Sequence, residues 1–440
     1  MDQGENRQNI LIISGVIALI IATIAAIYFV FFYDGGGEEN GEPPTFGETS
    51  ETREGTNPER ESDRESGSGV FDPESRLRLV HEEPTAGATT VLKGSEPPTS
   101  DETETDTTKD EFVRLLERES SHVFDVDLES LEKERLSSTT IPRIHEAIWT
   151  SGGDRVILRY LDEDNQTIKT YTAALVEKES ELEAGETPFE LSGEFLQDDI
   201  PQLVSSPKGS EIFWLDSAPT KTTGIVSAPD GTNQSAVFSS SFSEWLPQWF
   251  SSGTVNMTTK ASGRTDGYSY DLPISTGQLE RNIGDEEGLT TLTNPDGSYI
   301  LYSVSGRSNL SVHIYNTATG NSRDLFIETL PEKCVWADTE TAYCGVPEDI
   351  GSGMYPDVWY KGQTSFSDSI FEIDASEGNA QEIYSPSETD SENIDIYKPF
   401  ISESEEYLIF NNKADMSLWA FSLDQTEELI IPGVDEVDGL

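Results

Sequence analysis

Short runs of β-branched and aromatic residues alternate with turns rich in Gly, Asn, Asp and Ser from about residue 76 onward. Runs of this length and composition, bounded by such turns, are typical of strands that bury one face. No convincing stretch in this part of the chain places apolar residues at the spacing of an amphipathic helix. We therefore predict that this part of the chain is all-β.

One repeating unit is legible in residues 288–330. It reads as a strand GLTTLT, a turn Asn294–Gly297, a strand SYILYSV, a polar turn, a strand LSVHIYN, a turn Thr317–Gly320 and a strand SRDLFIE. Four strands in roughly 43 residues match the size of one blade in a repeat protein built from four-stranded sheets.

Similar units recur along the chain, each marked by a large apolar residue just before its first tight turn. Three of the six intervals between these markers cluster near 44 residues. The two longest contain insertions, at residues 94–109 and 348–369. The markers are Val91, Trp149, Val204, Trp249, Leu292, Trp336 and Phe400. The three tryptophans among them recur at one position per unit, so we expect them to pack between neighbouring units.

An aromatic residue, a Ser-Pro-Asp-Gly-like turn, a V-x-F or I-x-Y strand and an Ile-Tyr-x-Asp-x-x-Thr-Gly-like strand and turn follow one another in these units. The best matches are residues 294–297 with 313–320, and residues 369–378. This order resembles the TolB-type, WD-like β-propeller repeats of bacterial envelope proteins over roughly residues 76–432. The resemblance implies a β-propeller of four-stranded blades. Seven markers favour seven blades, with six or eight still open. The strand Arg76–Val80 is expected to pair with the final blade, which would close the ring and remove a sheet edge.

The first 33 residues contain a candidate membrane segment. Residues 10–33 are 24 residues without a charge, enough for a helix to cross about 30 Å of hydrocarbon. A cleavable signal peptide has a shorter apolar run, of about 7–15 residues. Arg7 precedes the segment and acidic residues follow it, so residues 1–9 are predicted to be cytoplasmic and the rest to lie outside the cytoplasmic membrane.

Two polar stretches flank or interrupt the repeats. Residues 34–69 are rich in Gly, Glu, Pro, Thr and Ser, and lack the apolar residues needed to offset the entropy of ordering. They are predicted to be a disordered acidic stalk that leads into a propeller domain over residues 70–440. Residues 94–109 have a similar composition and are predicted to be a disordered insert within that domain.

The net charge is −55, with 83 acidic and 28 basic residues, and residues 111–440 alone carry −40. A polyanion repels nucleic acid, so nucleic acid is not expected as a partner. The acidic surface is interpreted as a solvated surface that keeps the protein soluble, for example in a saline medium that screens the repulsion between its charges. Cation binding is the alternative, although the chain has no Asp/Asn-rich calcium loop.

Cys334 and Cys344 are symmetric about Thr339. In a hairpin with its tip at Thr339 they face each other at a separation close to that of a disulfide. A disulfide is favoured over two buried thiols or a metal site, and it agrees with an extracytoplasmic location.

The sequence offers little evidence of catalysis. His81, His122, His145 and His313 are scattered, and neither a G-x-S-x-G elbow nor a phosphate or dinucleotide loop is present. No catalytic residue, metal site or cofactor is therefore predicted. An enzyme would need charged residues gathered in one pocket, and Arg143, Arg155 and Arg159 are the residues whose placement tests this.

The insertion 348–369 is the best candidate for a binding loop, because it places Met354, Tyr355, Trp359 and Tyr360 among Gly and Ser. Trp245 and Trp359 fall outside the repeat register, and are candidates for recognition or for local packing. The function predicted is that of a membrane-tethered extracytoplasmic scaffold that binds an envelope protein or ligand. The alternatives are an envelope hydrolase and a cation or ligand sensor, with a site at the mouth of the propeller channel.

Overall fold

The computed structural model describes residues 75–94, 109–178, 186–306, 310–386 and 393–423, all within one compact unit, Asp72–Leu440. The predicted cytoplasmic tail (1–9), membrane segment (10–33) and stalk (34–69), and nearly all of the insert 94–109, lie outside the described residues. None of the described residues forms a helix that is long and apolar enough to cross a membrane. The described part is all-β, as predicted, with one short helix, α2 (Asp357–Tyr360), and two 3-10 turns, η1 (Ser151–Gly153) and η2 (Pro331–Lys333).

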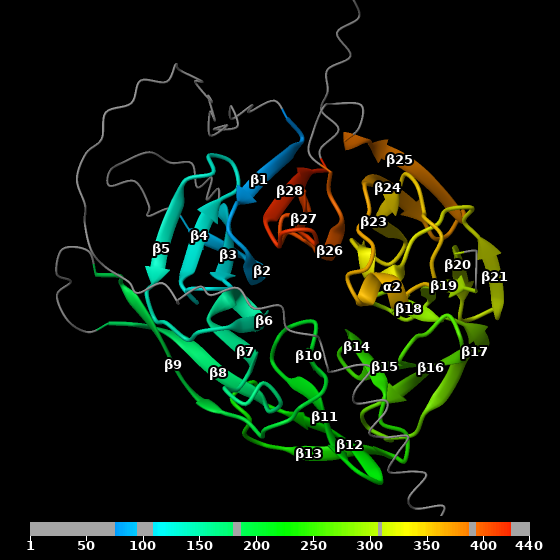
Figure 1. The fold of residues 1–440 in the computed structure, drawn as a ribbon, viewed down its shortest axis with the longest axis horizontal. Helices are drawn as coiled ribbons and strands as arrows, with labels where there is room; N and C mark the ends of the chain where they lie inside the picture. The colour runs from blue at the N-terminus through cyan, green and yellow to red at the C-terminus, as the bar shows by residue number, and fades with distance from the viewer. Residues whose placement is uncertain (1–74, 95–108, 179–185, 307–309, 387–392, 424–440) are drawn as a thin grey trace, which may run out of the picture. The chain divides into compact units, whose positions relative to one another are not determined.

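The strands form five sheets of four strands and one of eight (Figure 1). The eight-stranded sheet contains two antiparallel meanders, joined only by a parallel bridge between Ser137 and Phe189. The first meander is β2 (Thr85–Gly94), β3 (Lys109–Glu117), β4 (Val123–Asp127) and β5 (Lys133–Ser137). The second is β6 (Ile144–Trp149), β7 (Arg155–Leu161), β8 (Ile168–Glu177) and β9 (Phe189–Phe195).

Four further meanders follow in chain order. The first of these is β10 (Leu203–Ser205), β11 (Ile212–Ala218), β12 (Lys221–Ser227) and β13 (Ser235–Ser240). The next is β14 (Trp245–Ser251), β15 (Thr254–Thr259), β16 (Asp266–Pro273) and β17 (Glu280–Glu287). Then come β18 (Thr290–Thr293), β19 (Tyr299–Ser305), β20 (Leu310–Asn316) and β21 (Asn321–Asp324). The last is β22 (Cys334–Trp336), β23 (Thr341–Pro347), β24 (Asp368–Asp374) and β25 (Asn379–Tyr384).

The remaining sheet joins the two ends of the folded unit. Its strands β26 (Ile396–Ile401), β27 (Tyr407–Asn412) and β28 (Leu418–Ser422) come from the C-terminal part, and β1 (Leu77–His81) completes it. The register pairs Leu77 with Phe421 and His81 with Leu418. The predicted pairing of the N-terminal strand with the last repeat is thereby confirmed.

Separate apolar clusters fill the junctions between consecutive sheets. The cluster between β2–β5 and β6–β9 includes Trp149, and the clusters at two later junctions include Trp249 and Trp336. The indole of Trp149 donates to Gly87 O in the preceding meander at 3.3 Å, and the indole of Trp336 donates to Leu292 O at 3.2 Å. The predicted packing role of these tryptophans is confirmed.

A further cluster joins the closing sheet to the first meander, through Ile409 and Leu418 on one side and Val113 and Leu115 on the other. The sheets therefore form a closed ring in which strands such as β2, β6, β10, β14 and β26 lie innermost (Figure 1), which is the arrangement of a β-propeller. Each of the seven sequence markers lies on the first strand of a four-strand unit.

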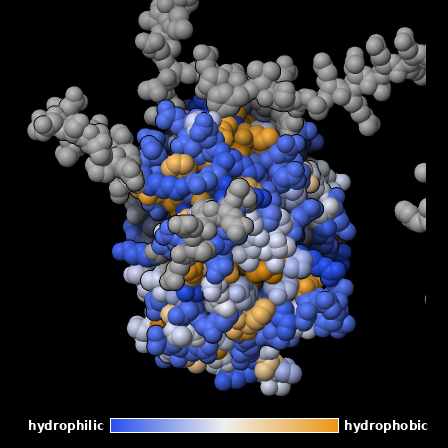
Figure 2. Space-filling view, turned by 90° about the vertical axis from the view of Figure 1, so that its left-hand side faces the viewer, coloured by the Kyte–Doolittle hydropathy of each residue, from blue (hydrophilic) through white to orange (hydrophobic). Residues whose placement is uncertain are grey.

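The surface agrees with the composition. Figure 2 shows a face covered mainly by hydrophilic residues, with hydrophobic residues in small, scattered groups. Among the larger apolar side chains, Phe326 (89% exposed) and Phe195 (58% exposed) are the most accessible.

Candidate functional site

The connections between β5 and β6, β7 and β8, and β27 and β28 all lie at one end of the ring, because successive strands are antiparallel. Together with the starts of β6 and β26, they enclose a cavity of about 750 Å³, which we call the mouth cavity. This volume is within the usual range of small-molecule sites. Its lining consists of Ala86, Arg118, Arg143, His145, Glu146, Arg159, Tyr160, Leu161, Asn165, Ile168, Pro201, Gln202, Tyr397, Lys398, Lys413 and Met416.

The charge of the mouth cavity is opposite to that of the chain. Five cationic side chains line it, and Glu146 is the only carboxylate among the lining residues. The cations are Arg118, Arg143, Arg159, Lys398 and Lys413. The whole chain carries a net charge of −55, so this concentration of basic groups differs sharply from the average surface.

Glu146 neutralises part of this charge on one side of the mouth cavity. Its Oε2 accepts from Arg159 Nη1 at 2.7 Å, and its Oε1 accepts from Lys398 Nζ. Burial alone would raise the pKa of this carboxyl, but Lys398 and Arg159 outweigh it and lower the pKa to about 2. Arg159 also donates through Nη2 to Ile200 O at 2.7 Å, so its guanidinium is held in place from two sides.

His145 lies on the other side of the mouth cavity, and its side chain is exposed. Arg118 Nη2 donates to its Nδ1, which places the imidazole proton on Nε2. Partial desolvation of the ring, together with the positive charge of Arg118, lowers the pKa of His145. The ring is therefore neutral at pH 7 and presents an N–H donor through Nε2.

Local backbone irregularities direct these side chains into the mouth cavity. The register of β6 shifts between Ile144 and Glu146, and that of β26 shifts between Tyr397 and Phe400. Such β-bulges turn side chains away from the regular alternation of a strand. Arg143 and Lys398 also adopt the left-handed region, with φ of 64° and 49°. This conformation is costly for residues other than glycine and is often found at functional sites.

A second cavity, of about 490 Å³, continues from the mouth cavity; we call it the channel cavity. The two share Gln202, Tyr397, Lys398 and Lys413. The channel cavity adds aromatic and hydroxyl groups, and its lining includes Trp359, Tyr360, Thr258, Thr290 and Thr291.

Glu332 also lines the channel cavity. It accepts a hydrogen bond from the Tyr360 hydroxyl, and its buried Oε2 has no hydrogen-bond partner among the described residues. Burial raises the pKa of the Glu332 carboxyl. Desolvation of the Tyr360 hydroxyl and the negative charge of Glu332 beside it raise the pKa of Tyr360.

The four residues predicted for the binding loop occupy different environments. Tyr355 and Trp359 are buried, at 3% and 1% exposure, in an apolar cluster with Phe366. Met354 lies near the surface and its sulfur accepts from Arg264 Nε at 3.0 Å. Trp359 and Tyr360 both border the channel cavity. The insertion thus forms part of the channel wall, and a binding role for it stays a prediction.

A buried ionic cluster holds this insertion against the ring. Lys333 is fully buried, its Nζ lies 2.7 Å from Asp368 Oδ2, and it also contacts Asp395. Asp395 in turn accepts from the indole nitrogen of Trp359 at 3.2 Å. Lys413 Nζ lies 4.5 Å from the centre of the Trp359 ring and donates to its carbonyl oxygen at 2.7 Å. The cluster therefore connects the insertion to the cationic residues of the mouth cavity.

Other residues singled out by sequence lie elsewhere. Arg143 and Arg159 come together in the mouth cavity, whereas Arg155 donates to Thr172 Oγ1 at 3.2 Å and does not line it. Trp245 is buried and its ring packs edge-on against Phe238, Phe242 and Tyr270, so it has a packing position. Sequence reasoning missed Arg118, Lys398 and Lys413. The described residues include no group of three or more His, Cys, Asp or Glu suited to hold a metal ion.

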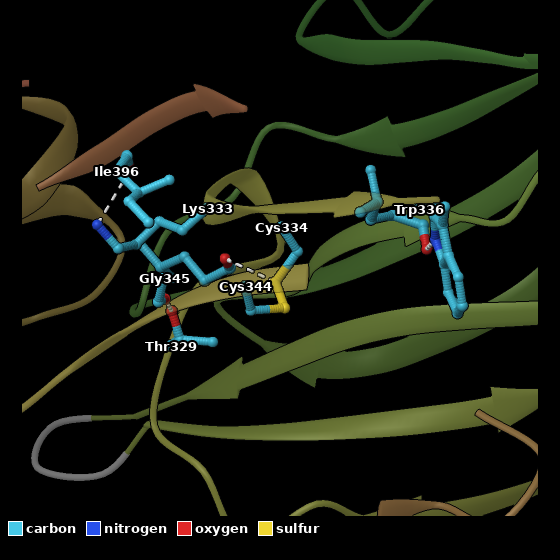
Figure 3. Close-up of a disulfide and its surroundings, with 9 residues drawn as sticks. Thr329, Lys333, Cys334, Trp336, Cys344, Gly345 and Ile396 are labelled. Carbon is cyan, nitrogen blue, oxygen red and sulfur yellow. Dashed lines mark hydrogen bonds between the residues drawn. A yellow bond between two sulfur atoms is a disulfide. The ribbon is translucent and has the colours of Figure 1, made fainter. Parts of the chain in front are cut away.

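The predicted disulfide is confirmed. Cys334 on β22 pairs with Cys344 on β23, and their sulfur atoms are bonded (Figure 3). Both cysteines are buried, and Cys334 borders the channel cavity. The bond thus fixes the hairpin that follows Lys333, at the inner edge of its sheet.

Comparison with known proteins yields fold likenesses only. No family model and no curated protein sequence matches the chain. Among solved structures it is similar to a puromycin-hydrolysing peptidase of Mycobacterium tuberculosis, with 14% identity and a TM-score of 0.44 over 70% of this chain and 46% of that one. It is also similar to an oligogalacturonate lyase in complex with manganese, with 8% identity and a TM-score of 0.44 over 78% and 99%.

TolB from Acinetobacter baumannii matches with 12% identity and a TM-score of 0.38, over 76% of this chain and 80% of that one. The chain spans about half the length of the peptidases it matches.

Proposed function

We propose that this chain is a membrane-tethered, extracytoplasmic β-propeller that binds an anionic ligand in the mouth cavity. The observation that carries the proposal is the gathering of five cationic side chains around one carboxylate in a chain of net charge −55. Repulsion from the acidic surface would keep anions away elsewhere, whereas the mouth cavity offers a local region of opposite potential. This makes the protein a ligand-binding module in preference to a purely structural one.

The state of Glu146 favours binding over catalysis. A general base is most effective when its pKa lies near the working pH. Arg159 and Lys398 hold the pKa of Glu146 at about 2, so it accepts protons poorly at neutral pH. Its role in the proposal is to offset part of the positive charge of these two cations.

The entry point of the chain supports the tether. Arg76 Nε donates to Ser422 O at 3.2 Å, at the end of β28 remote from the β27–β28 turn that lines the mouth cavity. The polypeptide therefore enters the ring at the end opposite the mouth cavity. In the proposal, residues 10–33 span the membrane, residues 34–69 form the stalk, and the mouth cavity is accessible to envelope ligands. The Cys334–Cys344 disulfide agrees with an oxidising compartment.

We also propose that the ring has seven blades. The support is that the eight-stranded sheet divides into β2–β5 and β6–β9 at a single bridge, and that each unit carries one marker residue on its first strand.

The proposal is tested by isothermal titration of the full chain in detergent, with citrate and phenyl phosphate as probes at low salt. The variant Arg143→Glu/Lys398→Glu reverses two charges in the mouth cavity, and Arg135→Glu/Lys221→Glu makes the same change at exposed positions outside it. We expect at least one probe to bind, and only the first variant to lose it. If neither probe binds, or if both variants weaken binding equally, the proposal is wrong.

A further inference from the structure

Within the mouth cavity, one group of cations differs from the rest in having no carboxylate partner. Arg159 and Lys398 are paired with Glu146. In contrast, Arg118, Arg143 and Lys413 form no ion pair with any described carboxylate. A guanidinium or ammonium group without a carboxylate partner in a concave site keeps donors available for an external anion.

Arg118 contacts His145 directly, and Arg143 and Lys413 line the same concave regions as His145. Together with His145, these residues line both the mouth cavity and a more open depression of about 810 Å³ that shares part of its lining, which we call the outer depression. Arg118 approaches His145 from the β3–β4 turn, Arg143 comes from the β5–β6 connection, and Lys413 from the β27–β28 turn. Three separate connections therefore direct positive charge to one place, and the Nε2–H of His145 adds a neutral donor.

The charge and donor geometry indicate the class of anion. A single carboxylate would balance only one of the three unpaired cations. A phosphate monoester carries a charge of about −1.5 to −2 and three acceptor oxygens, which suits two guanidinium forks, an ammonium group and an imidazole N–H. We propose that Arg118, Arg143, His145 and Lys413 form a subsite for the phosphate group of a phosphate monoester. The proposal rests on the binding function proposed above and specifies its ligand.

The surrounding charges are consistent with this assignment. Two carboxylates, Glu119 and Asp415, line the outer depression. Asp415 Oδ1 is engaged by the backbone N–H of Ser417 at 2.9 Å and by its hydroxyl, and Glu119 is exposed to solvent. With three cations against these two partly solvated carboxylates, the subsite stays positive.

Binding of a dianion should be linked to a proton on His145. The charged groups that act on this ring are Arg118, Glu146, Lys398 and Arg159. The other charged groups that line the same cavities are Arg143, Lys413, Glu119 and Asp415. Desolvation of the ring and the excess of positive groups around it lower the pKa of His145, so the ring is neutral in the free protein at pH 7. A bound dianion reverses the local potential and favours the imidazolium form, so the complex takes up a proton at Nδ1. Arg118 then has no acceptor on the ring and donates to the anion instead.

The test compares phenyl phosphate with benzoate, since both have one aromatic ring and differ in the anionic group. Titration calorimetry of the full chain in detergent is expected to show phenyl phosphate binding at least tenfold more tightly. Arg118→Gln and Arg143→Gln are each expected to weaken phenyl phosphate binding about 10- to 100-fold, the usual effect of losing a charge-assisted hydrogen bond. Arg135→Gln is the matched control and should change binding less than twofold.

Inorganic sulfate separates the protein's proton from that of the ligand, because sulfate does not titrate in this range. Sulfate binding in two buffers of different ionisation enthalpy should show proton uptake near pH 6 that is absent in His145→Gln. Equal affinity for benzoate and phenyl phosphate, or dependence on Lys398 without dependence on Arg118 and Arg143, would overturn the phosphate subsite and leave anion binding intact. Failure of citrate, benzoate and phenyl phosphate alike would overturn the proposed function itself.

Discussion

Lys333 provides a sharp test of how the insertion is held. Its ammonium group is fully buried and lies between Asp368 and Asp395, and it also donates to Ile396 O at 3.1 Å (Figure 3). Lys333→Met keeps much of the side-chain volume and removes the charge. Two carboxylates then face each other without a cation.

The magnitude follows from burial. Removing one partner of a buried ion pair costs about 3–5 kcal/mol, because the remaining charge is left without compensation. Both Asp368 and Asp395 are fully or almost fully buried, so solvent offers little relief. Asp395 also anchors the Trp359 indole, so the loss should extend to the insertion.

The effect should depend on pH with a definite sign. Burial, opposed by Lys333, raises the pKa of Asp368 to about 6, above its unfolded value of 3.8. A carboxyl with a raised folded pKa binds its proton more tightly in the folded state, so its contribution to stability falls as pH rises from about 4 to 6. Without Lys333 this pKa should rise further. The variant should therefore lose more stability at pH 8 than at pH 5.

Urea unfolding of the full chain, followed by tryptophan fluorescence at pH 5 and pH 8, measures both quantities. The matched control is Lys361→Met in the same insertion, where the ammonium is 62% exposed and 3.9 Å from Asp357. That change should cost less than about 1 kcal/mol. A loss below about 1 kcal/mol for Lys333→Met at pH 8, or a loss equal at both pH values, would refute the reasoning.

Three further predictions concern the mouth cavity, the hairpin and the packing of the inner strands. Glu146→Gln should remove a contribution of about 2–3 kcal/mol to the free energy of unfolding. In the wild type this contribution is present above pH 4.5 and lost between pH 4.5 and 2, because the folded pKa of Glu146 is lowered to about 2. Acid unfolding curves of the variant that coincide with those of the wild type would contradict this. The same variant should bind anions more tightly in calorimetry. Reduction of the Cys334–Cys344 bond should cost about 2–4 kcal/mol in urea unfolding, and thiol labelling detected by mass should require prior reduction; labelling without reductant would disprove the bond. Gly87→Ala should lower the free energy of unfolding in urea by about 1–3 kcal/mol, because the added Cβ would lie 1.9 Å from Ala147 O. Gly94→Ala is the control and should have no such effect, because the space around Gly94 is open. Equal effects of the two changes would argue against close approach of β2 and β6.

Local features were predictable because short-range sequence determines them. The turn Asn294–Gly297 lies between β18 and β19 as expected, with Asn294 Oδ1 accepting from the Tyr299 amide at 3.0 Å and Gly297 at φ 78°. Asp296 and Gly297 belong to a turn chemistry that needs few neighbours to form. The pairing of Cys334 with Cys344 followed from hairpin symmetry for the same reason.

The closure of the ring could also be predicted from the sequence. An N-terminal strand, Leu77–His81, stands apart from the first complete repeat, and the last repeat has only three strands of its own. An unpaired edge on each side makes pairing between them favourable. The number of strands per unit and the spacing of the tryptophan markers were therefore enough to predict a ring of four-stranded units.

The cluster of basic side chains in the mouth cavity could not be predicted from the sequence. Its cations come from positions as far apart as Arg118 and Lys413, and nothing in their local spacing relates them. Arg118, Arg143 and Lys413 lie in connections, and Arg159 and Lys398 lie within β7 and β26. Each by itself is an ordinary charged residue that predicts a solvated surface. The bulge that turns Lys398 inward depends on pairing between β26 and β27.

The sequence by itself determined the strand pattern, the repeat length, the disulfide and the acidic character, because these depend on neighbours along the chain or on composition. Only the tertiary structure decided that a small group of basic side chains converges at one end of an otherwise acidic ring, and that the insertion with Trp359 becomes part of the channel wall. The physical reason is that ring closure brings the connections of distant units to one end, where electrostatic potential depends on position in space and not on order in the chain.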